Sequence, residues 1–265
     1  MFKNKDLLNK NHVDNLVFNN QMFAVSGVVI GSGERAGVSI GINKHGLAGC
    51  SATVLPTEDR PYDHLLENII QVADDIDSAY QIVEDKISSG IAYQWCNLVL
   101  GDSRSVAAIE ISNNQCKLER SDDYVVRTNH HVLLNTIDDL KAARAEKRGA
   151  SGPVWKSRRR RQKAERELAA ARTVVDVTEI LSSHSEGKGF DSICRHSDGG
   201  NLGRSFLGQT AYSYVFDVLY ADASVPGVTF HVAPGNPCVT TYKRLNIDFS
   251  SSKEERKKLT QKYPK

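Results

Sequence analysis

Residues 36–54, AGVSIGINKHGLAGCSATV, decide the fold class. Small and β-branched residues fill two short runs, 36–42 and 47–54, and Gly46 separates the two. Runs of this length and composition, bounded by glycine, are typical of neighbouring β-strands. Small side chains dominate the second run, which suits close packing between layers. We therefore expect two adjacent strands in a layered structure.

The sequence on either side extends this pattern. AVSGVVI at 24–30 predicts another strand, joined to the next one by a turn at 31–33. After residue 54, apolar residues recur at helical spacing over 62–70 and over 76–83. Asp75 precedes the second run and is a residue type that caps helices. These signals predict a pair of helices directly after the strands.

The rest of the chain alternates between groups of strands and groups of helices. Helices are expected over 136–184, apart from a turn at 148–153, and a glycine-containing loop is expected over 185–203. Further strands are expected at 96–100, 105–111, 115–120, 124–128, 210–219, 227–233 and 238–249. Because the strands come in groups and do not alternate singly with helices, the order favours an α+β fold of stacked layers. We expect one domain over 1–249 and a charged, frayed tail over 250–265.

The composition excludes several classes of protein. The chain has 265 residues, of which 40% are hydrophobic and 25% charged, and its mean hydropathy is −0.39. No apolar run approaches the roughly 20 residues that span a bilayer, so membrane, collagen-like and fully disordered proteins are excluded. The first residues carry no apolar secretory core, which indicates a cytoplasmic protein with no membrane partner. The five cysteines are scattered, so we expect neither a metal site nor disulfides.

Positive charge is concentrated in a basic helical arm at about 141–172. This arm holds 12 Lys and Arg against 3 acidic residues, whereas the net charge of the whole chain is only +2. Arg158–Arg161 within the arm are a candidate contact with nucleic acid, because neutralised phosphates release counterions. A solvated helix with alanine and leucine on its inner face is the alternative. GSGERAG at 31–37 is not expected to bind phosphate, since a strand follows where a phosphate loop needs a helix.

Four groups of residues stand out as candidates for chemistry. They are FKNKD (2–6), GINKHGLAGCSATV (41–54), CNLVLGDSRSVAAIEIS (96–112) with VVRTNHH (125–131), and DSICRH (191–196) with HVAPGNPC (231–238). In this order they resemble the acyl-coenzyme A:6-aminopenicillanic acid acyltransferase-like family of the N-terminal nucleophile hydrolases. Bile-salt hydrolases and penicillin V acylases are related to that family. The resemblance covers roughly residues 2–248.

The resemblance implies a four-layer αββα sandwich of two antiparallel sheets with helices outside. It also implies an amidohydrolase or acyltransferase for a linear amide bond, acting through a cysteine acyl-enzyme. In that chemistry an N-terminal cysteine attacks the carbonyl carbon and its own α-amino group serves as base. The resemblance implies no metal and no organic cofactor. The expected partners are small-molecule amide or acyl substrates, including coenzyme A thioesters if the acyl group is transferred.

The resemblance assigns roles to five residues. Asp6 matches the acid that orients the amino group of the nucleophile, and Lys3 stands where the family has arginine. Thr53 falls where bile-salt hydrolases place an oxyanion asparagine. Asn129 matches a polar site asparagine, and Arg195 matches the late site arginine. Each also has a plain structural alternative, such as a cap for Asn129 or a surface position for Asp6 and Arg195.

The family's nucleophile has no counterpart in the quoted motifs. It should precede FKNKD, where this sequence has only Met1, so we expect the nucleophile upstream of Met1. A catalytically inactive binding protein with the same fold is the alternative. Cys50 is a weaker candidate, because it lies within a predicted strand and lacks a free amine. His130 and His131 are expected at the edge of the site or in a structural role. Cys96, Cys116 and Cys238 are expected in the core.

Overall fold

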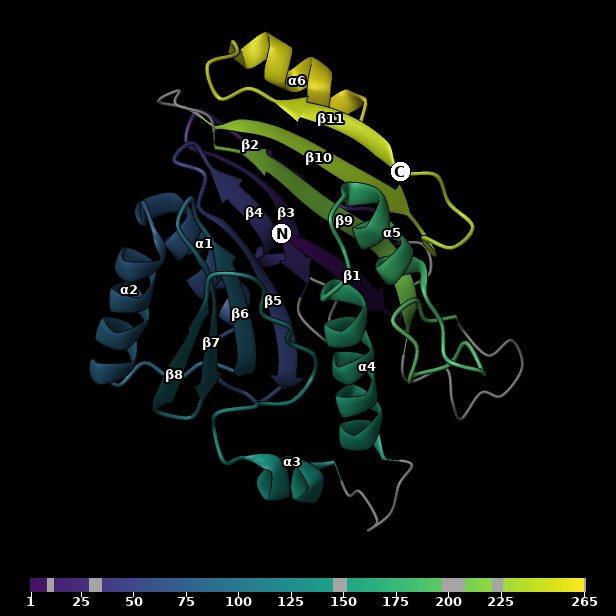
Figure 1. Cartoon of the computed structure of the whole chain (residues 1–265). Helices are drawn as coiled ribbons and strands as arrows, with labels where there is room; N and C mark the ends of the chain where they lie inside the picture. The colour runs from purple at the N-terminus through teal and green to yellow at the C-terminus, as the bar shows by residue number, and fades with distance from the viewer. Residues whose placement is uncertain (9–11, 29–34, 145–151, 197–207, 221–225, 265) are drawn as a thin grey trace.

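The computed structural model describes residues 1–8, 12–28, 35–144, 152–196, 208–220 and 226–264. Two antiparallel sheets face one another, and helices cover the outer face of each (Figure 1). This arrangement confirms the expected α+β fold of four αββα layers. The expected strand end at 29–30, the turn at 31–33 and most of the turn at 148–153 lie outside the described residues.

Within the described residues, the larger sheet has seven strands in sequence order, each antiparallel to the next. They are β2 (Leu16–Phe18), β3 (Met22–Val28), β4 (Arg35–Asn43), β5 (Ala48–Leu55), β6 (Trp95–Gly101), β7 (Val106–Ser112) and β8 (Gln115–Ser121). The residues quoted first above form β4 and β5, in the middle of this sheet.

The smaller sheet joins the two ends of the chain. Its order is β1 (Phe2–Leu7), β9 (Gln209–Leu219), β10 (Gly227–Pro234) and β11 (Lys243–Ile247). Phe2 pairs with Val215, and Leu7 pairs with Gln209. In the described part of the chain, β1 is an edge strand whose only partner is β9.

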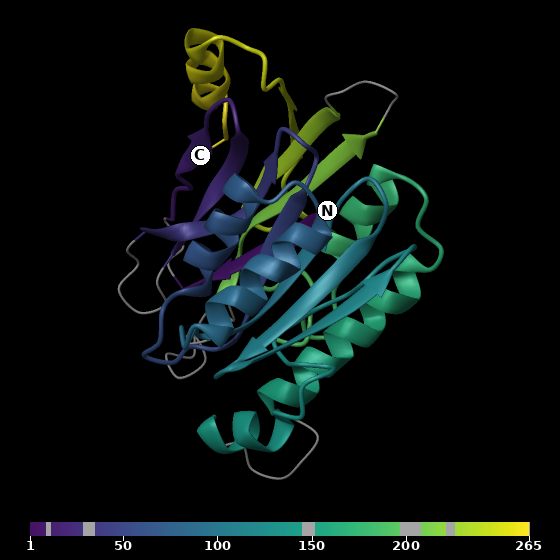
Figure 2. The same ribbon diagram turned by 90° about the vertical axis from the view of Figure 1, so that its left-hand side faces the viewer.

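Helices form the two outer layers. α1 (Tyr62–Val72) and α2 (Ile76–Ser88) lie across the larger sheet (Figure 2). On the other side, α4 (Pro153–Leu168) packs against α5 (Val174–Ser182), and α5 lies on β9 and β1. α3 (Ile137–Ala143) precedes α4, and α6 (Lys253–Gln261) follows the last strand. Asp75 caps α2 as expected, since its side chain accepts from the backbone N–H of Ser78 at 2.9 Å.

Among the described residues, alternation along the strands produces the two largest hydrophobic cores, one on each face of the larger sheet. Phe23 and Val25 of β3 face the smaller sheet, whereas Met22 and Ala24 face α1 and α2. Between the sheets, large aromatic rings fill the space; the Phe23 and Phe230 centroids are 5.1 Å apart. Side chains that alternate along a strand point to opposite faces, so a strand buried on both faces supplies both cores.

Three expectations about secondary structure were wrong. Residues 124–128 form no strand, because side chains from β6 and β7 engage the backbone that follows. The last strand starts only at Lys243, since residues after Pro237 form a turn. The tail is not frayed: it forms α6, capped by Ser252, and Tyr263 is buried. β2, three residues long, was not foreseen.

One buried carboxylate ties the two ends of the chain together. Asp14 Oδ1 pairs with Lys5 Nζ at 2.8 Å, and its Oδ2 accepts from the hydroxyls of Tyr214 and Tyr263, each at 2.6 Å. Burial raises the pKa of Asp14, but His12, Lys5 and Tyr214 outweigh it and lower that pKa to about 2. The ionised form is therefore the one that the folded protein stabilises.

The pKa of Asp14 predicts a loss of stability in acid. Its folded value of about 2 lies below the ordinary value of 3.8. The stabilisation is thus present above pH 4 and is lost as the pH falls toward 2, by up to about 2.5 kcal/mol. Urea unfolding from pH 7 to pH 2 measures this loss. Asp14→Asn should remove most of this pH dependence, whereas the exposed control Asp122→Asn should retain it. If the free energy of unfolding falls with pH in the same way in wild type and in Asp14→Asn, Asp14 is not the group responsible for the loss.

Candidate functional site

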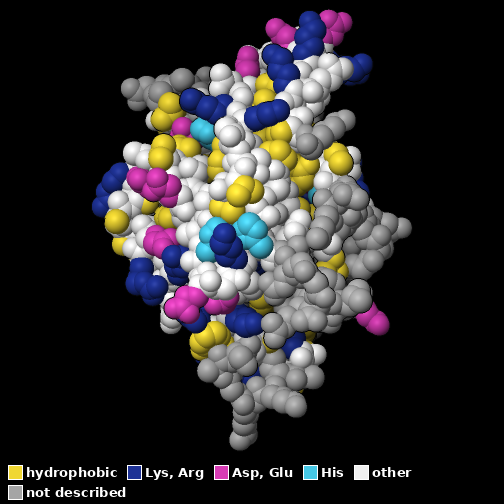
Figure 3. Space-filling view, turned by 90° about the vertical axis from the view of Figure 1, so that its right-hand side faces the viewer, with side chains coloured by type: hydrophobic (Ala, Val, Ile, Leu, Met, Phe, Trp, Pro, Cys, Tyr) yellow, Lys and Arg dark blue, Asp and Glu magenta, His cyan; other side chains and the backbone are white. Residues whose placement is uncertain are grey.

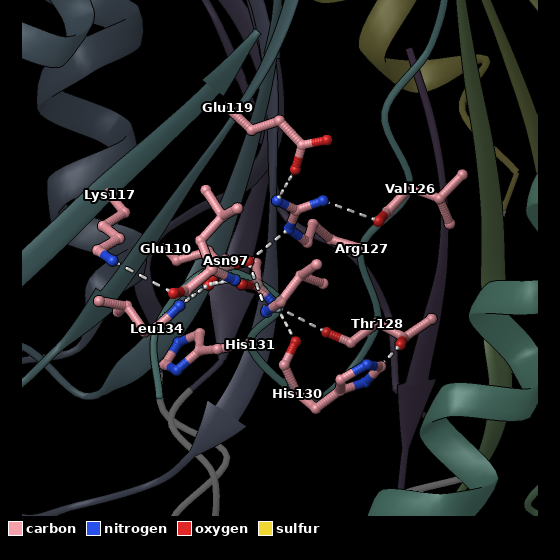
Figure 4. A network of polar contacts seen from close by, with 12 residues as sticks. Asn97, Glu110, Lys117, Glu119, Val126, Arg127, Thr128, His130, His131 and Leu134 are labelled. Carbon is pink, nitrogen blue, oxygen red and sulfur yellow. Dashed lines mark hydrogen bonds and ion pairs between the residues drawn. The ribbon is translucent and has the colours of Figure 1, made fainter. Parts of the chain in front are cut away.

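A buried carboxylate on β7 holds the segment that carries Asn129. Glu110 accepts backbone N–H bonds from Val132, Leu133 and Leu134 at 2.7, 2.8 and 2.9 Å (Figure 4). It also pairs with Arg127 Nε at 2.9 Å, and both side chains are almost fully buried. Arg127 reaches Glu119 as well. Because a buried charge needs this many partners, the path of residues 126–134 is closely determined.

Two further side chains complete the support of this segment. Asn97 Nδ2 donates to the carbonyl oxygens of Thr128 and His130 at 2.8 and 3.1 Å. On the opposite side, the backbone N–H of Asn129 donates to Ser157 Oγ of α4 at 2.9 Å. The backbone of Asn129 is therefore held between β6 and α4.

The side-chain amide of Asn129 is the centre of the candidate site. Its Oδ1 accepts from Arg160 Nη2 at 2.6 Å and from Arg195 Nη2 at 3.3 Å, and its Nδ2 donates to the carbonyl of Thr53 at 2.8 Å. Two guanidinium donors and one carbonyl acceptor determine which end of the amide is oxygen. Among the described residues, the second Nδ2 hydrogen has no acceptor, so it is free to bind a ligand.

Asp6 and Arg195 join the same group of contacts. Asp6 Oδ2 lies 3.1 Å from Arg195 Nη1, and Asp6 Oδ1 accepts from Thr210 Oγ1 at 2.8 Å. Arg195 Nε is buried and has no partner among the described residues. The structure thus brings Asp6, Arg195 and Asn129 together. Thr53 joins this group through its backbone carbonyl, which accepts from Asn129 Nδ2. The Thr53 hydroxyl itself bonds to Tyr62.

Lys3 lies apart from this group, between the two sheets. Its ammonium donates to Ser39 Oγ and to the carbonyl of Ser51, each at 2.6 Å. Burial lowers the pKa of Lys3, and Asp63 partly offsets that effect. Its contacts join β1 to β4 and β5, and it makes no hydrogen bond to Asn129 or Arg195 among the described contacts. A substrate-binding role for Lys3 therefore stays a prediction.

Asp63, at the start of α1, was missed by the sequence analysis. It accepts from Ser51 Oγ at 2.7 Å, and burial raises its pKa to about 6 although Lys3 opposes the rise. Two glycines make room for it. A Cβ on Gly27 would stand 1.9 Å from Asp63 Oδ2, and Gly37, with a φ of +49°, abuts the Asp63 carbonyl. These glycines are the sequence signal for a close approach between helix and sheet.

The basic arm also contributes a residue that the sequence analysis missed. Arg160 is 4% exposed and contacts Asn129, whereas Arg158 and Arg159 are exposed. Burial lowers the pKa of Arg160, and Arg195 lowers it further. The Phe190 ring lies 5.1 Å from the Arg160 guanidinium and 4.2 Å from that of Arg195. Contact of Arg158–Arg161 with nucleic acid stays a prediction, and Arg160 cannot take part in it while buried.

The adjacent histidines have structural roles. Burial, together with nearby arginines, lowers the pKa of His130 to about 3, and its Nδ1 lies 2.8 Å from Ser157 Oγ. His131 Nε2 donates to the carbonyl of Cys96 at 3.1 Å, so its Nδ1 accepts from Thr136 at 2.8 Å. Among the described contacts, neither imidazole ring makes a hydrogen bond to the side chain of Asp6 or Asn129.

The cysteines depart from the expectation in one respect. Cys96 is fully buried in the core and Cys116 packs beside it. Cys50 is also buried, which raises the pKa of its thiol and makes it a poor nucleophile. Cys238, expected in the core, instead lies partly exposed with its Sγ 3.7 Å from that of Cys194. Distant positions thus form a cluster that the spacing alone did not reveal.

Two surface hollows lie away from the candidate site. One of about 520 Å³ lies between α2 and β8, and one of about 330 Å³ lies beside Val126 and Glu165. Neither is lined by Asp6, Asn129 or Arg195. No helix in the described ranges has the length and apolar character needed to cross a bilayer.

The fold is shared with one solved acylase at low sequence identity. Penicillin V acylase from Agrobacterium tumefaciens superposes with a TM-score of 0.53 and 14% identity, over 96% of this chain and 84% of that one. A single-residue variant of conjugated bile acid hydrolase from Clostridium perfringens gives a TM-score of 0.47 and 9% identity. That superposition covers 87% of this chain and 83% of the other. No protein-family model matches the sequence, and no curated protein matches it. The likeness to penicillin V acylase shows a shared αββα fold.

Glu110 provides a direct test of how the site is held. Glu110→Gln removes the charge and turns an amide N–H toward groups that are themselves donors. We expect the free energy of unfolding to fall by about 3–5 kcal/mol, as when one member of a buried ion pair is removed. The matched control is Glu119→Gln, because Glu119 also contacts Arg127 but is 35% exposed. It should cost no more than about 1 kcal/mol. Equal losses in urea denaturation would refute the special role of Glu110.

Proposed function

We propose that this chain is an amidohydrolase or acyltransferase that acts on a linear amide bond through a cysteine acyl-enzyme. The nucleophile is expected from residues that precede Met1 in the native protein. The observation that carries the proposal is the convergence of Asp6, Arg195 and Asn129 in an αββα sandwich. The three come from different parts of the chain, and the sequence had singled them out before their proximity was known. Membership of the acyltransferase-like family is part of this proposal.

The proposed chemistry gives each group a defined task. The cysteine thiolate attacks the amide carbonyl carbon, a C–S bond forms, and the carbonyl oxygen becomes an oxyanion. The free Nδ2 hydrogen of Asn129 is placed to donate to that oxyanion. The amine then leaves with a proton, which breaks the C–N bond, and water or another amine attacks the resulting thioester. Asp6 and Arg195 orient the groups around the reacting carbonyl.

Charge around Asn129 favours a substrate that carries a carboxylate. Arg195 pairs with Asp6, whereas Arg160 is buried and makes no ion pair with a carboxylate among the described residues. Arg160 therefore leaves one positive charge without a paired carboxylate in a buried region. An anionic group on the substrate would compensate it, because buried charges are stable only when paired. We therefore propose an amide whose amine side bears a carboxylate.

The first test is performed on the protein isolated from its own cells. Its intact mass and N-terminal sequence are measured, and its activity is assayed with penicillin V and with a glycine-conjugated bile acid. A species that begins with cysteine and releases amine supports the proposal. A species that begins at Met1 or Phe2 and releases none contradicts it, and the site is then that of a binding protein.

Asn129→Ala tests the proposed oxyanion donor. In the native enzyme, this change should lower kcat by roughly 10²–10³, the effect of removing one oxyanion donor. KM should change much less, because the interaction strengthens in the transition state. Asn246→Ala, on the exposed face of β11, is the matched control and should leave kcat unchanged. A folded Asn129→Ala variant with wild-type turnover would remove Asn129 from the site.

Paired substrates test the proposed carboxylate. An N-acylglycine and the corresponding N-acylglycinamide differ only in that charge. We expect kcat/KM to favour the N-acylglycine by at least about tenfold, since each tenfold corresponds to about 1.4 kcal/mol. The preference should shrink in Arg195→Gln, which keeps a hydrogen-bond donor but no charge. An equal rate for the two substrates would rule out recognition of the carboxylate.

A further inference from the structure

Two histidines and two cysteines from three separate segments meet beside the candidate site. His184 follows α5, Cys194 and His196 lie in the segment before β9, and Cys238 lies in the turn after β10. Their ligand atoms all lie within 4.8 Å of one another. No other group of this kind is found among the residues that the structure describes. The proposed amide chemistry uses none of the four.

The distances within this Cys₂His₂ cluster match the edges of a metal tetrahedron. With zinc bonds of about 2.3 Å to sulfur and about 2.05 Å to nitrogen, tetrahedral ligands are separated by about 3.8 Å for S–S, 3.6 Å for N–S and 3.4 Å for N–N. The two Sγ atoms are 3.7 Å apart, and His196 Nε2 lies 3.8 and 3.2 Å from them. The two Nε2 atoms are 3.0 Å apart. Four of the six edges are thus near the tetrahedral values, and the other two, from His184 to the two sulfur atoms, are no longer than 4.8 Å.

We propose that His184, Cys194, His196 and Cys238 bind one zinc ion as a structural site. Two thiolates and two imidazoles in a tetrahedral arrangement are a donor set that zinc prefers. All four positions are supplied by the protein, which leaves no open position for a substrate or water. The side-chain amide of Asn236 donates to Cys194 Sγ at 3.6 Å and also bonds to the Arg195 carbonyl. Such outer contacts typically orient metal ligands.

The zinc ion would position the candidate site without entering it. Arg195 lies between Cys194 and His196 in the sequence, so ligation on both sides restricts its backbone. The same ion would join the loop after α5 to the turn after β10. Figure 3 shows that histidine side chains gather around a basic side chain on the face of the molecule that holds this loop. Three of the four ligand residues are partly exposed, so an ion can reach them.

Metal content and a spectroscopic probe test the proposal on the full chain. The protein is purified under reducing conditions and its zinc content is measured. We expect one zinc ion per chain, removal by a chelator, and a lower Tm for the metal-free protein. Cobalt(II) added to that protein should give the visible absorption of a tetrahedral site and a thiolate charge-transfer band, and zinc should abolish both. No stoichiometric metal, or cobalt without the thiolate band, would overturn the proposal.

Variants separate ligation from folding and from disulfide formation. Cys238→Ser should weaken zinc binding by more than the roughly 10–100-fold that is typical when a residue hydrogen-bonded to a metal ligand is changed. Its Tm without metal should equal that of metal-free wild type, because Cys238 is partly exposed. Cys116→Ser is the matched control and should bind zinc normally. If Cys194 and Cys238 instead form a disulfide and the reduced protein binds no zinc, the proposal is wrong. None of these readouts depends on the proposed hydrolase activity.

Discussion

The buried carboxylate of Glu110 is the interaction on which the candidate site depends. Three successive backbone amides and one guanidinium converge on it, so a segment without regular secondary structure follows a single path through the interior. Asn129 owes its position to this anchor and to Ser157 on the opposite side. A loop can carry chemistry in a buried place only when its backbone groups are satisfied in this way.

Polar groups inside the sandwich form two systems that meet at β1. One runs from Asp6 through Arg195 to Asn129 and Arg160, and it joins the smaller sheet to α4. The other runs from Lys3 through Ser51 to Asp63, and it joins the smaller sheet to α1. Lys3 and Asp6 lie only three residues apart, on either side of a register shift between Lys5 and Asp6. Side chains three residues apart on a strand point to opposite faces, so one short strand serves both systems.

The sequence predicted the layered fold, and it singled out three residues that lie together in the candidate site. Strand alternation and the Asp75 cap are local signals, and they identified the sheets and the helix pair correctly. Asp6, Asn129 and Arg195 were found through the order of motifs, and the structure brings them into contact. Arg160 was missed because a run of four arginines gives no sign of which one turns inward. Cys194 and Cys238 were missed as a pair because they lie 44 positions apart, and only the packing of a turn against a loop joins them. The Ser252 capping box was a readable signal for α6.

The pairing of β1 with β9 has a consequence for the order of events during synthesis. Phe2 finds its partner at Val215, more than 200 residues later in the chain. At about 5–20 residues per second, translation needs on the order of 10–40 s to supply that partner. During this interval β1 emerges from the ribosome with both edges open and with Lys3 and Asp6 uncompensated. β1 is therefore synthesised long before the strand that pairs with it, and it joins the smaller sheet only after β9 has been made.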